Sequence, residues 1–331
     1  MTDFKRYGWK TNDTNLNTLP PEAPEAAKLL TKWLTLQGRK STLEEYLKCE
    51  KDGKIHGKFW HIGAWTHRCS HSNPNQANIP SVFSDEPTTP VEEVKDRYDG
   101  EIRSLFYTDQ WLVGTDADAI QLRVLAHYMK SDEYVEAIVK GNKSDGTDIH
   151  SLNMRALGSV CRDRDTSKTF IYAWLLGASS VKVAEILGCS IPQAKAATDR
   201  FIKSYPGLKK LKEYEIPRDA ARGYFIGLDG RKVPCSSEHH MLAGYLQNGE
   251  AIIMKRAMRN WKARLDKSGV NYKLLNFVHD EWQTEVTGTA DLAHKVGVTQ
   301  SDALREEGQK LKLFCPLSGT FKIGHNWKET H

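Results

Sequence analysis

The sequence has 331 residues, with 47 lysines and arginines against 42 aspartates and glutamates, so its formal net charge is +5. This length allows a large buried core and two or three lobes. The six cysteines form no CxxC pair, which argues against a disulfide framework or a zinc site. No apolar run reaches 18 residues and the start lacks an apolar signal core, which argues against a membrane span. These features predict a soluble, cytoplasmic protein.

The N-terminal segment is predicted to be irregular first and helical afterwards. Residues 1–20 are polar and end in two prolines. Apolar residues at helical spacing predict a helix over 22–36, and Ser41 is placed to cap a second helix over 41–49. Arg39 and Lys40 lie at the junction, where they could contact a backbone phosphate or stay solvated.

Between residues 53 and 99 the helical pattern stops. Glycine, histidine, tryptophan, asparagine and proline become frequent, and the segment 66–80 is dense in side chains that form hydrogen bonds. Residues 84–99 are acidic and interrupted by prolines, so we expect an exposed excursion there.

The stretch 111–129 predicts a strand that runs into a helix. Its apolar start leads to Asp116 and Asp118, and an apolar pattern of helical type follows. A strand that ends in an aspartate presents a carboxylate at the edge of a sheet. Asp116 could equally be the N-cap of the helix.

Two helices are predicted next, one opened by Asp148, Ile149 and His150 and one within 162–179. In the second helix Arg164, Lys168 and Tyr172 are spaced by four and therefore share one face. Two cations and a phenol on one face suit a polyphosphate and a flat ring. A solvated amphipathic helix would more often pair such cations with acidic residues at i+4, and this helix has none there.

The segment 180–264 is basic and mostly helical. From Arg200 to Arg264 there are 14 basic residues against 6 acidic ones, which suits a phosphate-rich partner, although solvated lysines give the same excess. Residues 183–201 resemble a helix-turn-helix, 223–234 predict a hairpin around Asp229 and Gly230, and 245–258 predict a helix that carries Gln247. The tail predicts a helix and a short strand.

The stretch 276–286 predicts two strands joined by a tight polar turn of His279, Asp280 and Glu281. Two adjacent carboxylates at the tip of a hairpin repel each other, so a bound cation or a positively charged partner would explain them. A solvated hairpin tip is the alternative.

Taken together, the aspartate at the strand end, the cationic helix and the HDE hairpin resemble motifs A, B and C of family A DNA polymerases. The segments RDTSKTFIYAWLLGA, DGKIHG, LDGRKV, GTDIH and GHNW resemble the bacteriophage branch. The resemblance implies an α+β, right-hand fold with a helical thumb over 1–60, a palm with an antiparallel sheet over 61–131 and 241–331, and fingers over 132–240.

The resemblance also implies a mechanism of phosphoryl transfer with two Mg²⁺ ions, or with Mn²⁺ as a substitute. Asp116 and Asp280 would bind both ions, and the carbonyl of Ala117 would be a further ligand. Lys168 would protonate the departing pyrophosphate. Glu281 would support the site from behind.

The other residues that the resemblance implies contact the nucleotide or the DNA. Arg164 and Lys168 match the residues that bind the β and γ phosphates, His150 a further phosphate contact and Tyr172 the ring beside the incoming sugar and base. The implied DNA contacts are Arg68 and Gln247 in the minor groove, Asn75 and Asn78 on the backbone, and His279 as a neighbour.

This sequence departs from the family pattern at three positions. Gln121 stands where the family has a glutamate that blocks a ribose 2′-hydroxyl, and Leu176 stands where a tyrosine supports that glutamate. We hypothesise that sugar selection is either relaxed or enforced mainly by packing of Gln121 and Tyr172. Ala243 replaces an asparagine, so Arg68 and Gln247 would read the minor groove largely without it.

Phage-type members carry an N-terminal 3′–5′ exonuclease domain, whereas this sequence begins at the thumb-like helices. The resemblance therefore implies a monomeric polymerase module without proofreading, located in the host bacterial cytoplasm. Its expected partners are primer-template DNA, deoxynucleoside triphosphates and a separate exonuclease polypeptide or other replication proteins; a truncated enzyme would equally lack the domain.

Two other functions stay open. A single-subunit RNA polymerase uses the same palm chemistry, and Gln121 is compatible with it. A non-catalytic protein could instead bind DNA through the helix-turn-helix at 183–201, but this leaves Asp116, Lys168 and Asp280 unexplained.

Overall fold

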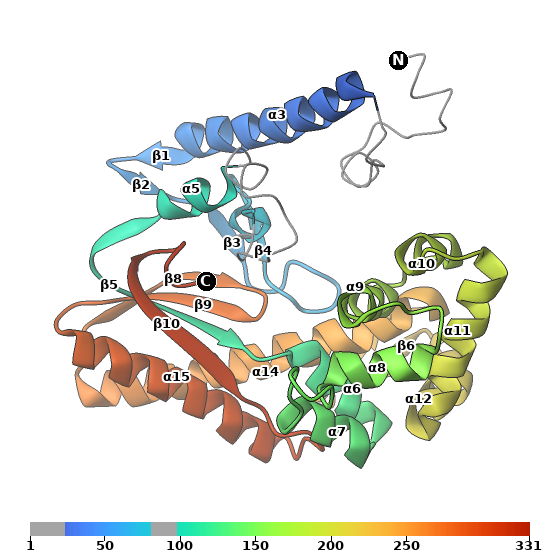
Figure 1. Cartoon of the computed structure of the whole chain (residues 1–331). Coiled ribbons are helices and arrows are strands. Elements are labelled where there is room, and N and C mark those ends of the chain that lie inside the picture. Colours follow the sequence, from blue (N-terminus) through green and yellow to red (C-terminus); the bar gives the residue numbers. More distant parts are fainter. Residues whose placement is uncertain (1–23, 81–97) are drawn as a thin grey trace.

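The computed structural model describes residues 24–80 and 98–331 (Figure 1). The predictions for residues 1–20 and for most of 84–99 therefore lie outside the described residues. No helix in the two described ranges is long and apolar enough to cross a bilayer.

The first helix, α3 (Glu25–Cys49), is continuous, so the prediction of two separate helices is wrong. The segment contains no proline, and the Thr42 hydroxyl donates to the carbonyl of Gly38 at 3.1 Å across the expected break. Ser41 is thus an interior residue and caps nothing. Arg39 pairs with Asp99, the first residue of α5 (Asp99–Ser104), at 2.6 Å.

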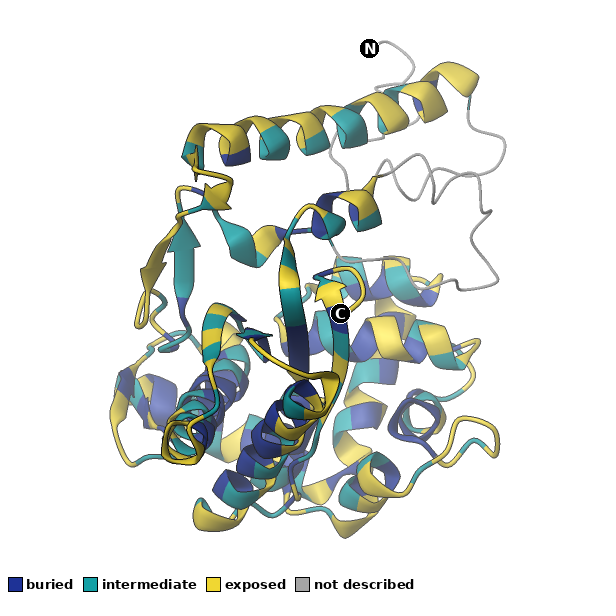
Figure 2. Ribbon diagram, turned by 90° about the vertical axis from the view of Figure 1, so that its left-hand side faces the viewer, coloured by how far each residue is buried: buried dark blue, intermediate teal, exposed yellow. Residues whose placement is uncertain are grey.

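Only Ala27 and Tyr46 of α3 are buried, and the helix lies apart from the body of the molecule (Figure 2). Four short strands connect it to the body. They form two antiparallel pairs, and a single 3-10 turn, η1 (Gln76–Asn78), follows them. The strands are β1 (Glu50–Lys51), β2 (Lys54–Ile55), β3 (Lys58–Trp60) and β4 (Ser70–Ser72).

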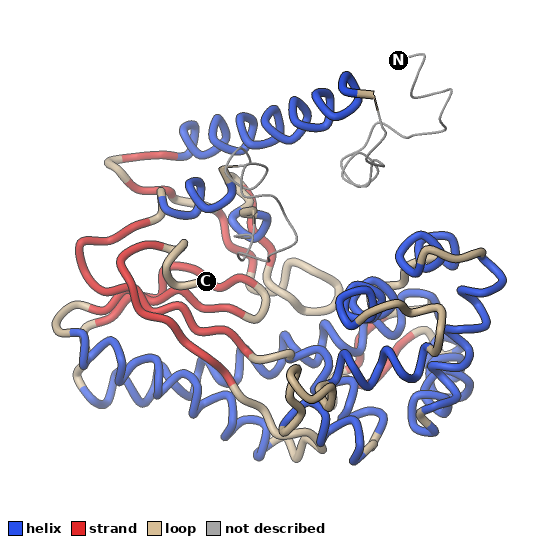
Figure 3. Tube along the Cα trace, viewed as in Figure 1, coloured by secondary structure: helices blue, strands red, loops and turns tan. Residues whose placement is uncertain are grey.

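The main sheet is antiparallel, with strand order β10-β5-β9-β8 (Figure 3). Two long helices, α14 (Glu238–Ser268) and α15 (Ala290–Lys310), lie beneath it (Figure 1). The predicted strand at Asp116, the hairpin and the C-terminal strand are all present, and the α+β class is confirmed. The strands are β5 (Tyr107–Ala117), β8 (Tyr272–Val278), β9 (Glu281–Val286) and β10 (Gly319–Asn326).

The remaining helices gather beside the sheet and share one hydrophobic core with it. The helix-turn-helix geometry is present in α10 and α11, where Gly188 supplies the left-handed turn residue with φ +64°. The elements are α6 (Ile120–Met129), α7 (Asp132–Val139), α8 (Ile149–Leu157), α9 (Arg164–Leu175), α10 (Ser180–Leu187), α11 (Ile191–Ser204), α12 (Pro206–Lys210), the π-turn η2 (Leu211–Glu215), α13 (Ile216–Ala221) and the hairpin β6 (Tyr224–Ile226) with β7 (Lys232–Pro234).

The hairpin of β8 and β9 turns on two residues, His279 and Asp280, because Val278 pairs directly with Glu281. His279 takes the left-handed conformation, with φ +51°, that a tight turn requires. Glu281 is the first residue of β9, so placing it in the turn was wrong. Asp280 is thus a turn residue, whereas Glu281 belongs to the sheet and pairs with Asp116 of β5.

The Glu281 carboxylate is buried and attaches the C-terminal tail to the sheet. It accepts hydrogen bonds from the indole N–H of Trp327 at 2.6 Å, from the ring of His331 at 3.0 Å and from the amide of Gln283. Burial alone would raise the pKa of Glu281, but these hydrogen bonds lower it below its usual range. Glu281 is therefore an ionised anchor of the fold.

We predict that Trp327→Phe lowers the free energy of unfolding by about 1–3 kcal/mol, because a buried carboxylate loses a donor while the aromatic volume is largely kept. Urea unfolding followed by circular dichroism measures this change. Trp33→Phe, at a tryptophan of α3 that is 57% exposed, is the matched control and should change stability little. Equal stability of the two variants would contradict the anchoring role of Trp327.

Candidate active site

The backbone places Asp116 and Asp280 side by side. Asp116 is the penultimate residue of β5 and pairs across the ladder with Glu281, the residue that follows Asp280. The N–H of Ala117 donates to the carbonyl of Asp280 at 3.0 Å, which fixes the turn against the strand end. The N-cap of α6 is Ala119, without a side-chain hydrogen bond, so the alternative interpretation of Asp116 as a helix cap is wrong.

Negative charge accumulates at this strand end. The Asp116 side chain is exposed, yet the pKa of its carboxyl is raised to about 8, first because surrounding protein withdraws it from bulk water and then because Asp280, Glu281 and Asp118 are nearby. The pKa of Asp280 is also raised, by burial and by Glu250. Within the described residues neither Asp116 nor Asp280 has an ion pair. The pair is thus suited to a cation.

The donor set fits a magnesium ion that is shared with a substrate. The described part of the chain contains no cluster of three or more side chains able to bind a metal. Magnesium, however, is usually held by one or two carboxylates together with substrate phosphates and water. Two adjacent carboxylates and the backbone at Ala117 supply such hard oxygen ligands.

Asp118, close by in sequence, has a structural role. Its carboxylate accepts hydrogen bonds from the hydroxyls of Ser318 at 2.6 Å and Thr320 at 3.0 Å. Arg123, buried in α6, donates to the Asp118 carbonyl at 2.7 Å and to Ser318 at 2.8 Å. These bonds hold the loop after β5 against the start of β10, so Asp116 lies on a fixed support.

Helix α9 carries the predicted cationic face. Lys168 is exposed and has no ion pair among the described side chains, so its charge is available to a ligand. Tyr172 lies further along the same face. The pKa of its phenol is raised by burial and then by Asp280 and Asp116, so this part of α9 lies within electrostatic reach of both aspartates.

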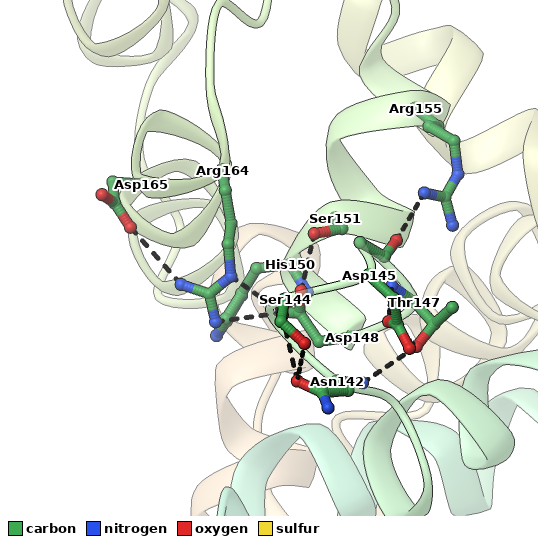
Figure 4. Close-up of polar contacts among 11 residues, drawn as sticks. Asn142, Ser144, Asp145, Thr147, Asp148, His150, Ser151, Arg155, Arg164 and Asp165 are labelled. Atoms are coloured by element: carbon green, nitrogen blue, oxygen red, sulfur yellow. Dashed lines mark hydrogen bonds and ion pairs between the residues drawn. The ribbon is translucent and has the colours of Figure 1, made fainter.

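Arg164, at the start of α9, is less free than the sequence indicated. It is bound to Asp148 at 3.0 Å and to Asp165 at 3.4 Å (Figure 4). Burial opposes ionisation of Asp148, but hydrogen bonds from Arg164, Ser151 and the His150 N–H lower its pKa to about 2. The sequence indicated no acidic partner for Arg164, because α9 has no acid at i+4. The partner is instead Asp148, the N-cap residue of the neighbouring helix α8.

His150 is buried next to this ion pair. Burial and the adjacent Arg164 lower its pKa to about 4, so the ring is neutral near pH 7. Its Nδ1 has no hydrogen-bond partner in the described part of the chain, and its ring centroid lies 6.0 Å from that of Tyr172. A phosphate contact by His150 would therefore be a neutral N–H donor and not a cation.

A second cluster, which the sequence did not predict, lies around Glu250 in the middle of α14. Its carboxylate pairs with Arg68 at 2.5 Å and accepts from the Gln121 amide at 3.0 Å. The signal available in the sequence was a single acid followed by the apolar run Ala251 to Met254. Gln247, one turn earlier, accepts a hydrogen bond from the hydroxyl of Thr66 at 3.3 Å. The loop with Thr66 and Arg68 therefore contacts α14 at two successive turns, through Gln247 and Glu250.

The remaining predicted residues lie at the edges of this region. Asn75 caps η1 by accepting from the Ala77 N–H at 3.1 Å, and Asn78 is exposed at the end of that turn. Leu176 follows α9 and is 52% exposed, whereas Gln121 bonds to Glu250. His279 precedes Asp280 in the hairpin turn, and its pKa is lowered by burial and then by Arg68.

Comparison with known proteins agrees with this arrangement. The chain is 31% identical to the DNA-directed DNA polymerases of the Enterobacteria phage T3 and the Escherichia phage T7, in each case over 94% of this chain and 47% of the relative. It is 28% identical to DNA polymerase I of Chloroflexus aurantiacus, over 99% of this chain and 35% of that protein. The chain thus spans about half the length of its phage relatives.

A solved structure confirms the fold. The POL domain of Pol1 from M. smegmatis, in complex with a DNA primer-template and dNTP, superposes with a TM-score of 0.79 over 98% of this chain and 57% of that one, at 21% identity. The right-hand polymerase fold expected from the sequence is therefore present. The family description "DNA polymerase family A" matches residues 2–329, and the chain belongs to that family.

Proposed function

We propose that this chain is a template-directed DNA polymerase that extends a primer 3′-hydroxyl with deoxynucleoside triphosphates and releases pyrophosphate. The observation that carries the proposal is the pair Asp116, on β5, and Asp280, in the turn between β8 and β9, held together by the strand pairing and lying within electrostatic reach of helix α9 in a member of DNA polymerase family A. Two carboxylates without an ion pair among the described residues, together with an exposed lysine of α9 that is also unpaired in that part of the chain, suit a polyphosphate and divalent ions.

Each residue of the site has a distinct task in this proposal. Asp116 and Asp280, with the Ala117 carbonyl, would hold two Mg²⁺ ions or Mn²⁺ in their place; metal bound there would supply Lewis-acid activation of the primer hydroxyl and charge neutralisation of the triphosphate. Lys168 binds the β and γ phosphates and gives a proton to the departing pyrophosphate. Tyr172 positions the incoming base and sugar.

Supporting residues orient the substrates. Arg164, held by Asp148, can still present its guanidinium edge to phosphate, and His150 donates an N–H from a neutral ring. We propose that the DNA contacts come from the predicted set, on the loops and the helix around Asp280. This set comprises Arg68, Gln247, Asn75, Asn78 and His279.

We further propose that 1–60 acts as a thumb, 61–131 and 241–331 as the palm, and 132–240 as the fingers. The isolated position of α3, the sheet that carries both aspartates and the helical block with α9 support this division. The absence of proofreading, the separate exonuclease polypeptide and the monomeric state stay predictions from the sequence.

An RNA polymerase-like activity is the second candidate, and Gln121 is compatible with it. An amide in place of the family's glutamate leaves the choice of sugar open. A primer-extension assay with deoxynucleotides and ribonucleotides in separate reactions decides between the two: extension only with ribonucleotides would replace the first proposal.

Asp116→Asn and Asp280→Asn should each lower primer extension by about 100-fold or more, because each removes a charge that the divalent ions require. Steady-state rates on a primed template, with saturating Mg²⁺, measure the loss. Asp302→Asn, which breaks a surface pair with Arg305 on α15, is the control and should retain near-normal activity. Activity within a few-fold of the wild type in either site variant would refute the assignment.

Lys168→Ala should reduce kcat by roughly 100-fold, since a positioned general acid contributes about 10²- to 10⁴-fold. Lys182→Ala, at a lysine of α10 that pairs with Glu185 at 3.0 Å, keeps the helical block intact and serves as the comparison. Single-turnover incorporation of one nucleotide gives the rate of chemistry. A loss confined to KM would assign Lys168 to binding alone.

The raised pKa of Asp116 predicts a pH dependence of stability in EDTA. A carboxyl with a higher pKa in the folded than in the unfolded state binds its proton more tightly when folded, so stability falls as pH rises from about 4 to about 8. The melting temperature of the wild type should therefore fall more steeply between pH 5 and 8 than that of Asp116→Asn. Mg²⁺ should stabilise the wild type more at pH 8 than at pH 6, since it competes with protons. Parallel slopes for the two proteins would contradict the shift.

A further inference from the structure

Glu250 is a buried acid for which the catalytic steps above have no use. It lies in the middle of α14 and its residue surface is fully buried. One of its oxygens, Oε2, receives both the Arg68 guanidinium at 2.5 Å and the Gln121 amide at 3.0 Å. An isolated buried carboxylate is costly, so the pairing with Arg68 is what allows the charge to remain there.

This cluster joins three segments that are far apart in the sequence. Arg68 comes from the loop before β4, Gln121 from the first turn of α6 and Glu250 from α14. It lies next to the aspartates, because the charge of Glu250 acts on Asp280 and the charge of Arg68 acts on both Asp280 and His279. Glu250 therefore connects α6, through Gln121, to the loop that carries Arg68.

The carboxylate also fixes how Gln121 is oriented. A carboxylate only accepts hydrogen bonds, so the Gln121 NH₂ must face Glu250 and its carbonyl oxygen must point away. A glutamine bound to a buried carboxylate that is paired with an arginine is held more firmly than one bound to water or to a neutral group. Gln121, five residues after Asp116, is thus held in one orientation, with its carbonyl oxygen directed away from Glu250.

Two buried atoms of the cluster lack partners within the described residues, namely Oε1 of Glu250 and Nε of Arg68. Each can form one more hydrogen bond without displacing an existing one. The cluster therefore holds two buried polar atoms that are unsatisfied within the described part of the chain. An arrangement built only to stabilise the fold would be expected to satisfy these atoms.

We propose that Glu250 is a positioning residue for nucleotide selection: it holds both Gln121 and Arg68 through one oxygen and thereby sets how strictly the enzyme rejects a ribose 2′-hydroxyl. The proposal rests on the proposed polymerase function. A side chain that cannot swing aside excludes an added hydroxyl group by volume, whereas a released Gln121 could move and admit it. Glu250 would thus act on the sugar without touching it.

The test compares kcat/KM for a deoxynucleotide and the matching ribonucleotide in single-nucleotide primer extension. Glu250→Gln keeps the shape but removes the charge that holds Arg68 and Gln121. We expect the preference for the deoxynucleotide to fall about tenfold, within the range that a pocket achieves against an added hydroxyl. Glu307→Gln, at a buried acid that pairs with Arg256 at 3.0 Å, is the matched control and should leave the preference unchanged.

The exchange variant Gln121→Glu with Glu250→Gln separates positioning from simple damage. It restores one acid and one amide at the contact, so the preference for the deoxynucleotide should return to within about threefold of the wild type. Gln121→Glu alone places two acids against each other and should show the weakest preference of the variants. A preference unchanged in Glu250→Gln, or effects of the two changes that merely add, would overturn the proposal.

Two further measurements keep each outcome interpretable. If Glu250→Gln fails to fold, Gln121→Met tests the same contact from the other side, and an unchanged preference in that variant would equally overturn the proposal. The wild type is measured first with deoxynucleotides: no extension would refute the proposed function itself, whereas normal extension with an unchanged ratio in the variants would refute only the role of Glu250.

Discussion

The antiparallel pairing of β5 with β9 is the constraint on which the active site depends. It places Asp116 next to the turn that carries Asp280, although two such carboxylates repel each other. The ladder hydrogen bonds, the buried Trp282 beside Trp261 of α14, and the bonds of Arg123 behind the strand end oppose that repulsion. The fold thus holds together two charges that would separate in a flexible chain.

Charge is distributed around this pair in a way that suits its chemistry. Lys168 is exposed and has no ion pair with any side chain that the structure describes, whereas Arg164 and Arg68 are bound to acids of their own. The aspartates themselves have no ion pair in the described part of the chain, so their charge is left for an external cation. A site neutralised internally would have no reason to bind Mg²⁺ or a triphosphate.

The sequence was sufficient for the elements whose signals are local. The strand end at Asp116, the face shared by Lys168 and Tyr172, and the hairpin at Asp280 follow from periodicity and turn chemistry, and their order indicated the family. The predictions that were wrong concern features that depend on packing. The break in α3 does not exist, because a glycine and polar residues are tolerated in an exposed helix, and Glu281 belongs to the strand because the tail buries it. Neither Asp148 beside Arg164 nor Glu250 beside Gln121 could be found, since their contacts join residues 16 and 129 positions apart.

The measurement that tests the central claim most directly is anomalous diffraction from Mn²⁺ in a ternary complex of this chain with a primer-template and a non-reactive deoxynucleotide. The account predicts two anomalous peaks, each bound by carboxylate oxygen of Asp116 or Asp280 and by nucleotide phosphate. A complex that binds the nucleotide but shows no peak at these carboxylates would contradict it.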